Sequence, residues 1–175
     1  MLEINRPYMA GFKRWVFQSG MLFQSWETWW GEKKPRTVAH EGIDLCTFED
    51  VNGLVKHVDG SIKIPAAFPG TIVKIDRDFL GRSIFISHNI YAADGRQLYM
   101  ALGHTNPGAT MHTENNVKEG EVIATISSPP QTAIPPHLHI TLAWIPVSLS
   151  TDYLTWKNLG SDQLITLIDP LSILH

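Results

Sequence analysis

Apolar and polar positions alternate over short stretches through the middle of the chain. From residue 61 onward, segments rich in Ile, Val, Tyr and Phe are separated by turn signals such as Asp94-Gly95. A period of two is typical of half-buried strands, and turns this close together favour antiparallel pairing because parallel strands need long crossovers. We therefore predict strands over residues 61–66, 70–76, 82–87, 97–102, 121–126 and 137–143.

The N-terminal segment, residues 1–36, follows a different pattern and is rich in aromatic side chains. Within it, Trp26, Trp29 and Trp30 have the spacing of one face of a helical turn. Two interpretations of this face remain open at this point. It either packs on the rest of the chain or forms a wall of a substrate cleft.

Length and composition fit one globular domain. The chain has 175 residues, of which 43% are hydrophobic and 18% charged, with no internal repeat and no low-complexity linker. We expect a single domain over residues 1–175, on which residues 1–36 pack. Near the C-terminus, Asp169 is suited to start a short helix with Pro170 at its first position. The predicted class is therefore mostly β and antiparallel, with short helices at the termini.

Charge and hydropathy exclude several kinds of partner. The net charge is −3 without a run of like charges, so we expect no nucleic-acid partner. No stretch of about 20 apolar residues predicts a membrane span, and no signal peptide is visible. The single cysteine, Cys46, excludes an internal disulfide; its apolar neighbours predict that it is buried.

A histidine and an aspartate lie four positions apart in His40-Glu41-Gly42-Ile43-Asp44. The segment begins like the HExxH zinc motif, but Asp44 takes the place of the second His, so Glu41 is not placed as the general base of that class. In an extended segment positions 40, 42 and 44 share one face, and Gly42 puts no side chain between the two possible ligands. A surface His near an Asp is also common, so the motif alone is weak.

Two further features involve histidine. In His137-Leu138-His139, a strand would turn both imidazoles to one side, while Leu138 and Ile140 face the other. His104 follows a predicted strand, where a loop could present it. The remaining four histidines match no motif, and we expect them at the surface or with satisfied hydrogen bonds: His57, His88, His112 and His175.

The three features together are typical of a catalytic zinc site. Such a site uses three nitrogen or oxygen ligands and leaves a fourth position for water. Two His and one Asp would supply these ligands, and the metal would lower the pKa of its bound water toward about 7. The two imidazoles left over would serve in proton transfer and in stabilising an oxyanion.

The ordered set of motifs resembles the lysostaphin/LytM-type zinc endopeptidases, which cut peptidoglycan cross-bridges. The resemblance covers roughly residues 36–174. It includes the His-x-x-x-Asp and Pro-His-x-His motifs, a segment that looks like the family's Gly-x-Val strand, a Val-x-x-Gly turn and a closing Asp-Pro-Leu. The matching segments are residues 40–44, 68–73, 117–123, 136–140 and 167–171.

This resemblance implies a site and a function. His40, Asp44 and His139 would bind Zn²⁺, and His104 and His137 would form the catalytic pair. The fold would be a β-sheet groove with a partly closed barrel-sandwich topology, of the duplicated hybrid motif kind, with zinc in the groove floor. The implied protein is a monomer in the cell envelope, periplasmic or extracellular, that hydrolyses peptide bonds in the stems or cross-bridges of peptidoglycan.

The chain departs from the family pattern in three places. Leu102 stands where the family usually has a Tyr before the third His, and a proline-rich segment, residues 127–135, replaces a Gly-rich loop. Residues 145–165 look inserted. Because prolines fix φ, we expect the loop to form a stiff cleft wall that bears on substrate choice.

Two alternatives have the same fold without this activity. One is a non-catalytic regulator or wall-binding module, which would be expected to lose ligands, whereas this chain retains them all. The other is a phosphocarrier, which uses two nearby histidines and needs no zinc for the transfer. The Asp44 position and the His-x-His pattern disfavour it.

Overall fold

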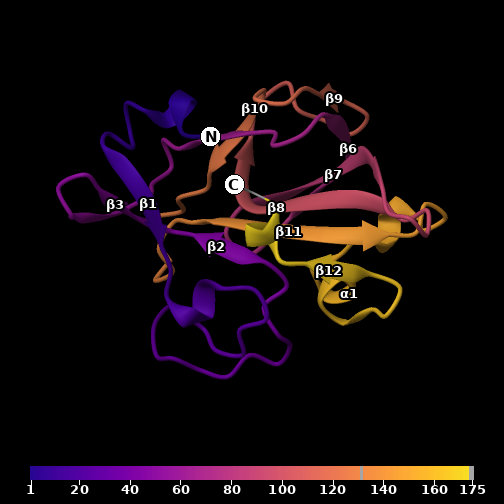
Figure 1. Cartoon of the computed structure of the whole chain (residues 1–175), viewed down its shortest axis with the longest axis horizontal. Helices are drawn as coiled ribbons and strands as arrows, with labels where there is room; N and C mark the ends of the chain where they lie inside the picture. The colour runs from indigo at the N-terminus through magenta and orange to yellow at the C-terminus, as the bar shows by residue number, and fades with distance from the viewer. Residues whose placement is uncertain (131, 174–175) are drawn as a thin grey trace.

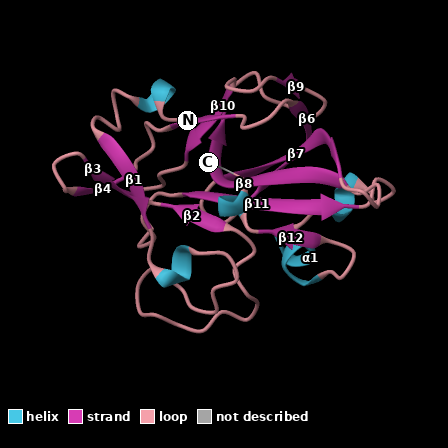
Figure 2. Ribbon diagram, viewed as in Figure 1, coloured by secondary structure: helices cyan, strands magenta, loops and turns pink. Residues whose placement is uncertain are grey.

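The computed structural model describes residues 1–130 and 132–173, which form strands joined by turns and a few short helices (Figures 1 and 2). The strands are β1 (Phe12–Val16), β2 (Ile43–Leu45), β3 (Thr47–Asp50), β4 (Val55–His57), β5 (Lys63–Pro65), β6 (Gly70–Arg77), β7 (Arg82–Tyr91), β8 (Gln97–Pro107), β9 (Asn116–Val117), β10 (Val122–Ile126), β11 (Leu138–Ile145) and β12 (Thr166–Ile168). The helical elements are η1 (Glu3–Asn5), η2 (Ser19–Met21), η3 (Thr151–Tyr153), α1 (Trp156–Ser161) and η4 (Pro170–Ser172).

Within the described residues, nine strands form one sheet. Its main path runs β12-β11-β8-β7-β6-β9; β2 pairs with β11, while β10 pairs with β5 and β8. A second sheet has the order β1-β3-β4. All of these pairings are antiparallel, which confirms the predicted mostly-β class. In this part of the chain the strands do not close into a barrel.

The alternating pattern predicted all six strands, but β7, β8 and β11 extend further than expected. β8 continues to Pro107, because residues 105–107 pair with β10. His104 therefore lies inside a strand, and the prediction that a loop presents it is wrong. Its backbone has a φ of 60°, and the pairing of β8 with β7 shifts register between Arg82 and Ile84.

The two faces of the large sheet have different neighbours. One face contributes Ile86, Met100 and Leu142 to the main core, where each fully buried aliphatic side chain stabilises the fold by about 1.5–3 kcal/mol. The opposite face carries Phe85 and Ala143, which pack against residues of the C-terminal segment in a second core cluster. In Figure 1 the yellow segment with α1 and β12 lies beside β11. The segment 145–165 thus covers part of one sheet face.

The three tryptophans of the N-terminal segment do not share a helix. Gly31, with a φ of 61°, turns the chain, and Glu27 bridges to Pro35, so the segment folds back on itself. Trp29 is buried beside Met21 and Cys46, whereas Trp26 is 64% exposed. The helical interpretation of their spacing is therefore wrong.

Smaller predictions have mixed outcomes. Asp169 caps η4, accepting a hydrogen bond from the backbone of Leu171 with Pro170 at the first helical position, as expected. His57 and His112 are exposed, but His88 is fully buried. The prediction for His175 lies outside the described residues. No helix among residues 1–130 and 132–173 has the length and hydropathy needed to cross a membrane.

Candidate metal centre

The register of three neighbouring strands brings the candidate ligands together. On β11, His139 is paired with Asp44 of β2 on one side and with Gly103 of β8 on the other. Ile43 and Leu45 point into the main core, so the period of two turns Asp44 to the opposite face. Leu138 and His139 divide in the same way. The apolar positions anchor the strands, and the polar positions meet on the face that the C-terminal segment partly covers.

Gly42 is required by the backbone beside it. A Cβ atom at this position would lie 2.1 Å from the carbonyl oxygen of Ile140, because the chain here runs against β11. We expected the glycine to leave space between two ligands on one extended segment. The structure shows instead that it permits close approach of two backbones, and that His40 precedes β2 rather than lying in it.

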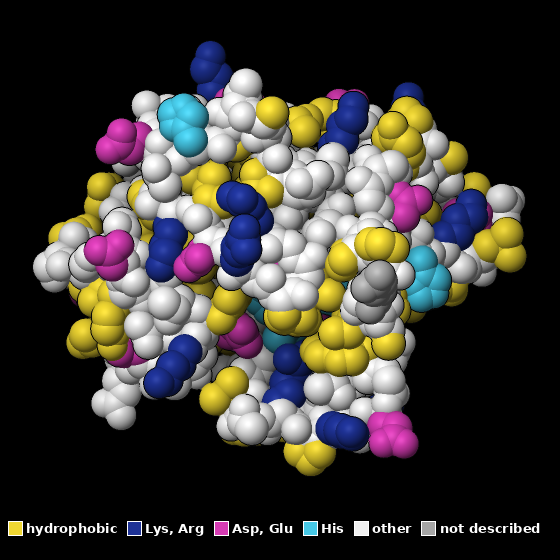
Figure 3. Space-filling model, turned by 180° about the vertical axis from the view of Figure 1, so that it is seen from behind, with side chains coloured by type: hydrophobic (Ala, Val, Ile, Leu, Met, Phe, Trp, Pro, Cys, Tyr) yellow, Lys and Arg dark blue, Asp and Glu magenta, His cyan; other side chains and the backbone are white. Residues whose placement is uncertain are grey.

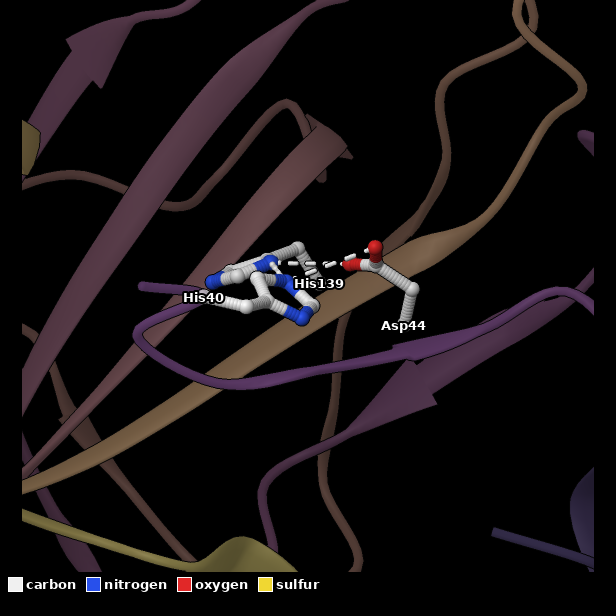
Figure 4. Close-up of side chains that lie close together, drawn as sticks. All are labelled: His40, Asp44 and His139. Carbon is white, nitrogen blue, oxygen red and sulfur yellow. Dashed lines mark hydrogen bonds and ion pairs between the residues drawn. The ribbon is translucent and has the colours of Figure 1, made fainter. Parts of the chain in front are cut away.

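Three donor atoms, one each from His40, Asp44 and His139, lie within 4.8 Å of one another (Figure 4). His40 Nε2 is 3.1 Å from His139 Nδ1, which is 2.8 Å from Asp44 Oδ1. All three side chains are buried. The structure therefore brings together the residues that the sequence predicted as ligands.

The outer nitrogen of each ring is already engaged. His40 Nδ1–H donates to the carbonyl oxygen of Leu22 at 3.0 Å, and His139 Nε2 shares a hydrogen bond of 2.8 Å with Thr141 Oγ1. These bonds leave His40 Nε2 and His139 Nδ1 to face each other and Asp44. Lone pairs held this close repel unless a proton or a metal cation lies among them, so the donor set fits a cation such as Zn²⁺.

The carboxylate stays ionised despite its surroundings. Burial alone would raise the pKa of Asp44, but the His139 and His40 rings beside the carboxylate hold this pKa well below its usual value. Asp44 is therefore a negatively charged oxygen donor at neutral pH, as metal binding requires.

His137 reaches the same centre from the start of β11. Its Nδ1–H donates to the carbonyl oxygen of Pro135 at 2.8 Å, and its Nε2 lies 3.8 Å from Asp44 Oδ1. Burial lowers the pKa of His137 to about 4, against the opposing effect of Asp44. At neutral pH this ring is uncharged, and the lone pair of Nε2 can accept a hydrogen bond.

His104 stands next to His137, with 4.6 Å between the ring centroids, and has an acidic partner that sequence reasoning missed. Asp78 Oδ2 accepts a hydrogen bond from the backbone N–H of His104 at 2.8 Å, and Asp78 Oδ1 lies 3.3 Å from His104 Nδ1. Ser83 Oγ also donates to this carboxylate. Burial would raise the pKa of Asp78, but the His104 ring beside it and the hydrogen bond from the His104 backbone hold this pKa well below its usual value.

A cleft of about 280 Å³ opens onto these residues. Figure 3 shows a hollow in this face, with histidine and basic side chains at its floor. Besides the four histidines and Asp44, the lining consists of Trp30, Arg36, Glu41, Phe79 and Trp156.

The N-terminal segment and one of the sequence departures contribute to this region. Trp30 from the N-terminal segment and Trp156 from residues 145–165 line the cleft. Trp156 also contacts the His139 ring edge-on, with 4.9 Å between centroids. None of the described residues of the proline-rich loop 127–135 lines the cleft; its Pro135 carbonyl instead anchors His137. The expectation that this loop forms a cleft wall is wrong for its described part.

Comparison with known proteins identifies a family and a similar fold. Residues 40–149 match the family model described as Peptidase family M23. The fold is similar to the catalytic domain of the antimicrobial peptidase lysostaphin from Staphylococcus simulans, with 18% identity, coverage of 95% of this chain and 94% of that chain, and a TM-score of 0.52.

Two further solved structures are similar. One is the catalytic domain of the prophage-encoded M23 protein EnpA from Enterococcus faecalis, with 22% identity, coverage of 74% and 85%, and a TM-score of 0.42. The other is LytU, with 18% identity, coverage of 82% and 85%, and a TM-score of 0.46. Among curated proteins, none matches the sequence. Because the family model spans more than half of the sequence, the chain belongs to peptidase family M23.

Proposed function

We propose that this protein is a zinc-dependent endopeptidase that hydrolyses peptide bonds of bacterial cell-wall peptidoglycan. One observation carries the proposal. In a chain of peptidase family M23, the ring nitrogens of His40 and His139 face the buried Asp44 carboxylate within 4.8 Å, with their outer nitrogens already bonded. We further propose that the whole chain acts as one domain and as a monomer in the cell envelope. Its partners are then the peptide stems or cross-bridges of the wall.

His40, Asp44 and His139 are the proposed metal ligands. When bound, zinc supplies an activated water and polarises the scissile carbonyl. The protein contributes three ligand atoms that already lie close together, so the side chains need not move when the metal binds. The carbonyl of Leu22 and the hydroxyl of Thr141 fix the two ring orientations, as outer hydrogen bonds commonly do at zinc sites.

His137 and His104 are the proposed catalytic pair. His137 is uncharged at neutral pH, and its Nε2 points toward the ligands, so it is suited to orient the attacking water or accept its proton. His104, held by Asp78, lies beside both His137 and His139, with 4.6 and 6.0 Å between the ring centroids, and is suited to stabilise the tetrahedral oxyanion.

The cleft walls are aromatic on several sides. Trp30, Phe79 and Trp156 surround the polar floor, so a bound peptide displaces water from around the ligands. Electrostatic interactions between the substrate and the floor become stronger as water leaves.

Metal analysis of the purified protein, combined with incubation on purified sacculi, tests this function. We expect about one zinc per chain and release of peptide fragments, with His139→Ala losing both. Protein that holds no stoichiometric zinc and stays inert after zinc addition would overturn the proposal. Sacculus binding that survives His139→Ala, without hydrolysis by the parent, would instead support a wall-binding module. Phosphohistidine formation from a phosphorylated carrier protein would support a phosphocarrier.

A further inference from the structure

A tryptophan outside the region matched by the family model bonds directly to a proposed metal ligand. Trp29 Nε1–H donates to Asp44 Oδ2 at 2.7 Å. Both side chains are buried, with Trp29 only 7% exposed. A hydrogen bond from a neutral donor to a buried carboxylate is short and strong, and water does not compete for it.

This bond fixes how the carboxylate is turned. Asp44 Oδ2 accepts from Trp29, while Oδ1 faces His139 Nδ1 at 2.8 Å. The two oxygens of a carboxylate turn together about the Cβ–Cγ bond, so hydrogen bonds to both oxygens restrict this rotation more than a bond to one. With the indole on Oδ2, Oδ1 stays directed at the point where the two histidine nitrogens meet.

The indole is itself held in place from several sides. Trp29 packs with Met21 and Cys46 in a small core cluster, and its ring meets the ring of Trp30 edge-on at 5.5 Å. It also meets the His137 ring edge-on at 5.0 Å. One indole therefore touches a proposed ligand through its N–H and a proposed catalytic histidine through its ring.

The surrounding loop is tied down at its other side. The Arg36 guanidinium lies over the Trp30 ring, 5.2 Å from its centroid, and donates to the carbonyl oxygens of Gly20 and Glu27. The loop also supplies the Leu22 carbonyl that fixes His40. In Figure 1 this segment forms the purple loop below β2. Two of the three proposed ligands thus depend on residues that precede the matched region 40–149.

We propose that Trp29 is a positioning residue of the metal centre, whose indole N–H sets the orientation of Asp44. This inference rests on the proposed function, since it takes Asp44 as a metal ligand. The N-terminal aromatic segment is then a working part of the peptidase, because the ligand-bearing strands supply a partner for Asp44 Oδ1, whereas Trp29 supplies the donor to Oδ2.

Zinc affinity tests the inference without using catalysis. Trp29→Phe removes the N–H donor but keeps an aromatic ring in the small core cluster. Trp26→Phe is the matched control, because Trp26 is exposed and lies outside the cleft lining. In competition with a chromophoric chelator, we expect Trp29→Phe to bind zinc roughly 10–100-fold more weakly than wild type, and Trp26→Phe to bind it unchanged.

Two further measurements separate positioning from general destabilisation. Thermal unfolding of the metal-free proteins shows whether Trp29→Phe is still folded, and so whether weaker zinc binding comes from a loss of fold. In the wild-type protein, the indole N–H resonance of Trp29 in ¹H–¹⁵N spectra should shift on zinc addition, while that of Trp26 stays in place. This second readout needs no variant and so remains decisive if Trp29→Phe does not fold.

The possible outcomes distinguish the two proposals. If wild type binds zinc and a folded Trp29→Phe binds it equally well, the positioning role is overturned and the proposed function stands. If the indole resonance of Trp29 does not shift on zinc addition, the positioning role is overturned in the same way. If wild type binds no zinc, both proposals fail. Weakened zinc binding in Trp29→Phe, in a protein that does not cleave sacculi, supports the role of Trp29 and overturns only the enzymatic function.

Discussion

Asp78 holds His104 at two points, through its backbone N–H at 2.8 Å and beside its Nδ1 at 3.3 Å. The backbone bond matters because His104 has a φ of 60°, a region that costs a residue with a Cβ on the order of 1–3 kcal/mol. The same carboxylate accepts hydrogen bonds from the backbone N–H groups of Leu80 and Gly81, so a tight turn presents it. A strained strand position and a buried acid together aim one imidazole at the cleft.

Replacing Asp78 by Asn should separate orientation of His104 from metal binding. Asp78→Asn keeps the size of the side chain but removes the charge that faces His104 Nδ1. We expect kcat/KM on peptidoglycan peptides to fall on the order of 10–100-fold, with zinc content unchanged. Loss of the buried charged hydrogen bonds should also lower the free energy of unfolding by about 2 kcal/mol.

The control for this change is Asp76→Asn, which alters an exposed carboxylate two residues away. It should leave both kinetics and unfolding unchanged. Wild-type kcat/KM in a correctly folded Asp78→Asn protein would contradict the role given to this acid.

Metal removal should reveal how far zinc stabilises the fold. A ligand that binds only the folded state stabilises it by about 2.7 kcal/mol when its concentration is 100 times its Kd. Adding zinc to chelator-treated wild type should therefore raise Tm. His139→Ala should lose this response because one of the three donors is missing. Differential scanning calorimetry measures both, and an equal rise in Tm for the two proteins would count against His139 as a ligand.

Gly42→Ala should damage the metal centre through the backbone. The new Cβ would lie 2.1 Å from the carbonyl oxygen of Ile140, so β2 and β11 must move apart. That movement separates Asp44 from His139, which are paired across these strands. We expect loss of zinc binding and a destabilisation of several kcal/mol, as for other severe overpacking. Zinc titration and urea unfolding measure the two effects.

Gly160→Ala serves as the comparison for Gly42→Ala. Its added Cβ would have no neighbour closer than 3.6 Å, and it lies in α1, where Ala is the better helix former. This variant should be neutral or slightly stabilising. Zinc affinity of Gly42→Ala equal to that of Gly160→Ala would show that the strand contact is not needed.

Cys46 should be unreactive in the folded protein. It is fully buried, as its apolar neighbours predicted, and burial raises the pKa of its thiol to about 12. Since the thiolate is the reacting form, alkylation at pH 8 should be slow until urea unfolds the chain. Mass spectrometry after iodoacetamide treatment measures the rate. Rapid alkylation without denaturant would show that the small cluster of Met21, Trp29 and Cys46 opens readily.

The part of the site that sequence could predict is the part governed by local periodicity. A strand period of two places Asp44 opposite Ile43, and His139 opposite Leu138, whatever the rest of the fold. Given two such strands, a polar face with an imidazole and a carboxylate follows. The sequence pattern could therefore predict the three candidate ligands, and the structure brings their donor atoms together.

The supporting residues were not accessible in the same way. Trp29 lies 15 residues before Asp44, and Asp78 lies 26 residues before His104. Neither separation has a periodic meaning, because each contact depends on how a loop returns to the sheet. Around Asp78 the sequence indicates only a turn, with Gly81 three residues later. A turn predicts the local backbone geometry but not which histidine the acid contacts.

His88 should make stability depend on pH. We expected it at the surface or with satisfied hydrogen bonds, but it is fully buried, and its Nε2 has no partner among the described residues. Its Nδ1–H donates to the carbonyl oxygen of Pro69. Burial lowers the pKa of His88, and the bond to Pro69 only partly opposes this effect.

The sign of the pH effect follows from this shift. In the unfolded chain the pKa of His88 returns to about 6.5, so acid protonates the unfolded state first. The contribution of His88 to stability is complete above that value and falls as pH drops below it. By pH 5 the loss is at most about 2 kcal/mol, from 1.36 kcal/mol per pH unit.

His88→Gln cannot titrate, so its unfolding free energy in urea should fall less between pH 7 and pH 5 than that of wild type. His112→Gln, which alters an exposed histidine, should keep the wild-type slope. Equal slopes for all three proteins would show that His88 is already charged, or solvated, in the folded state.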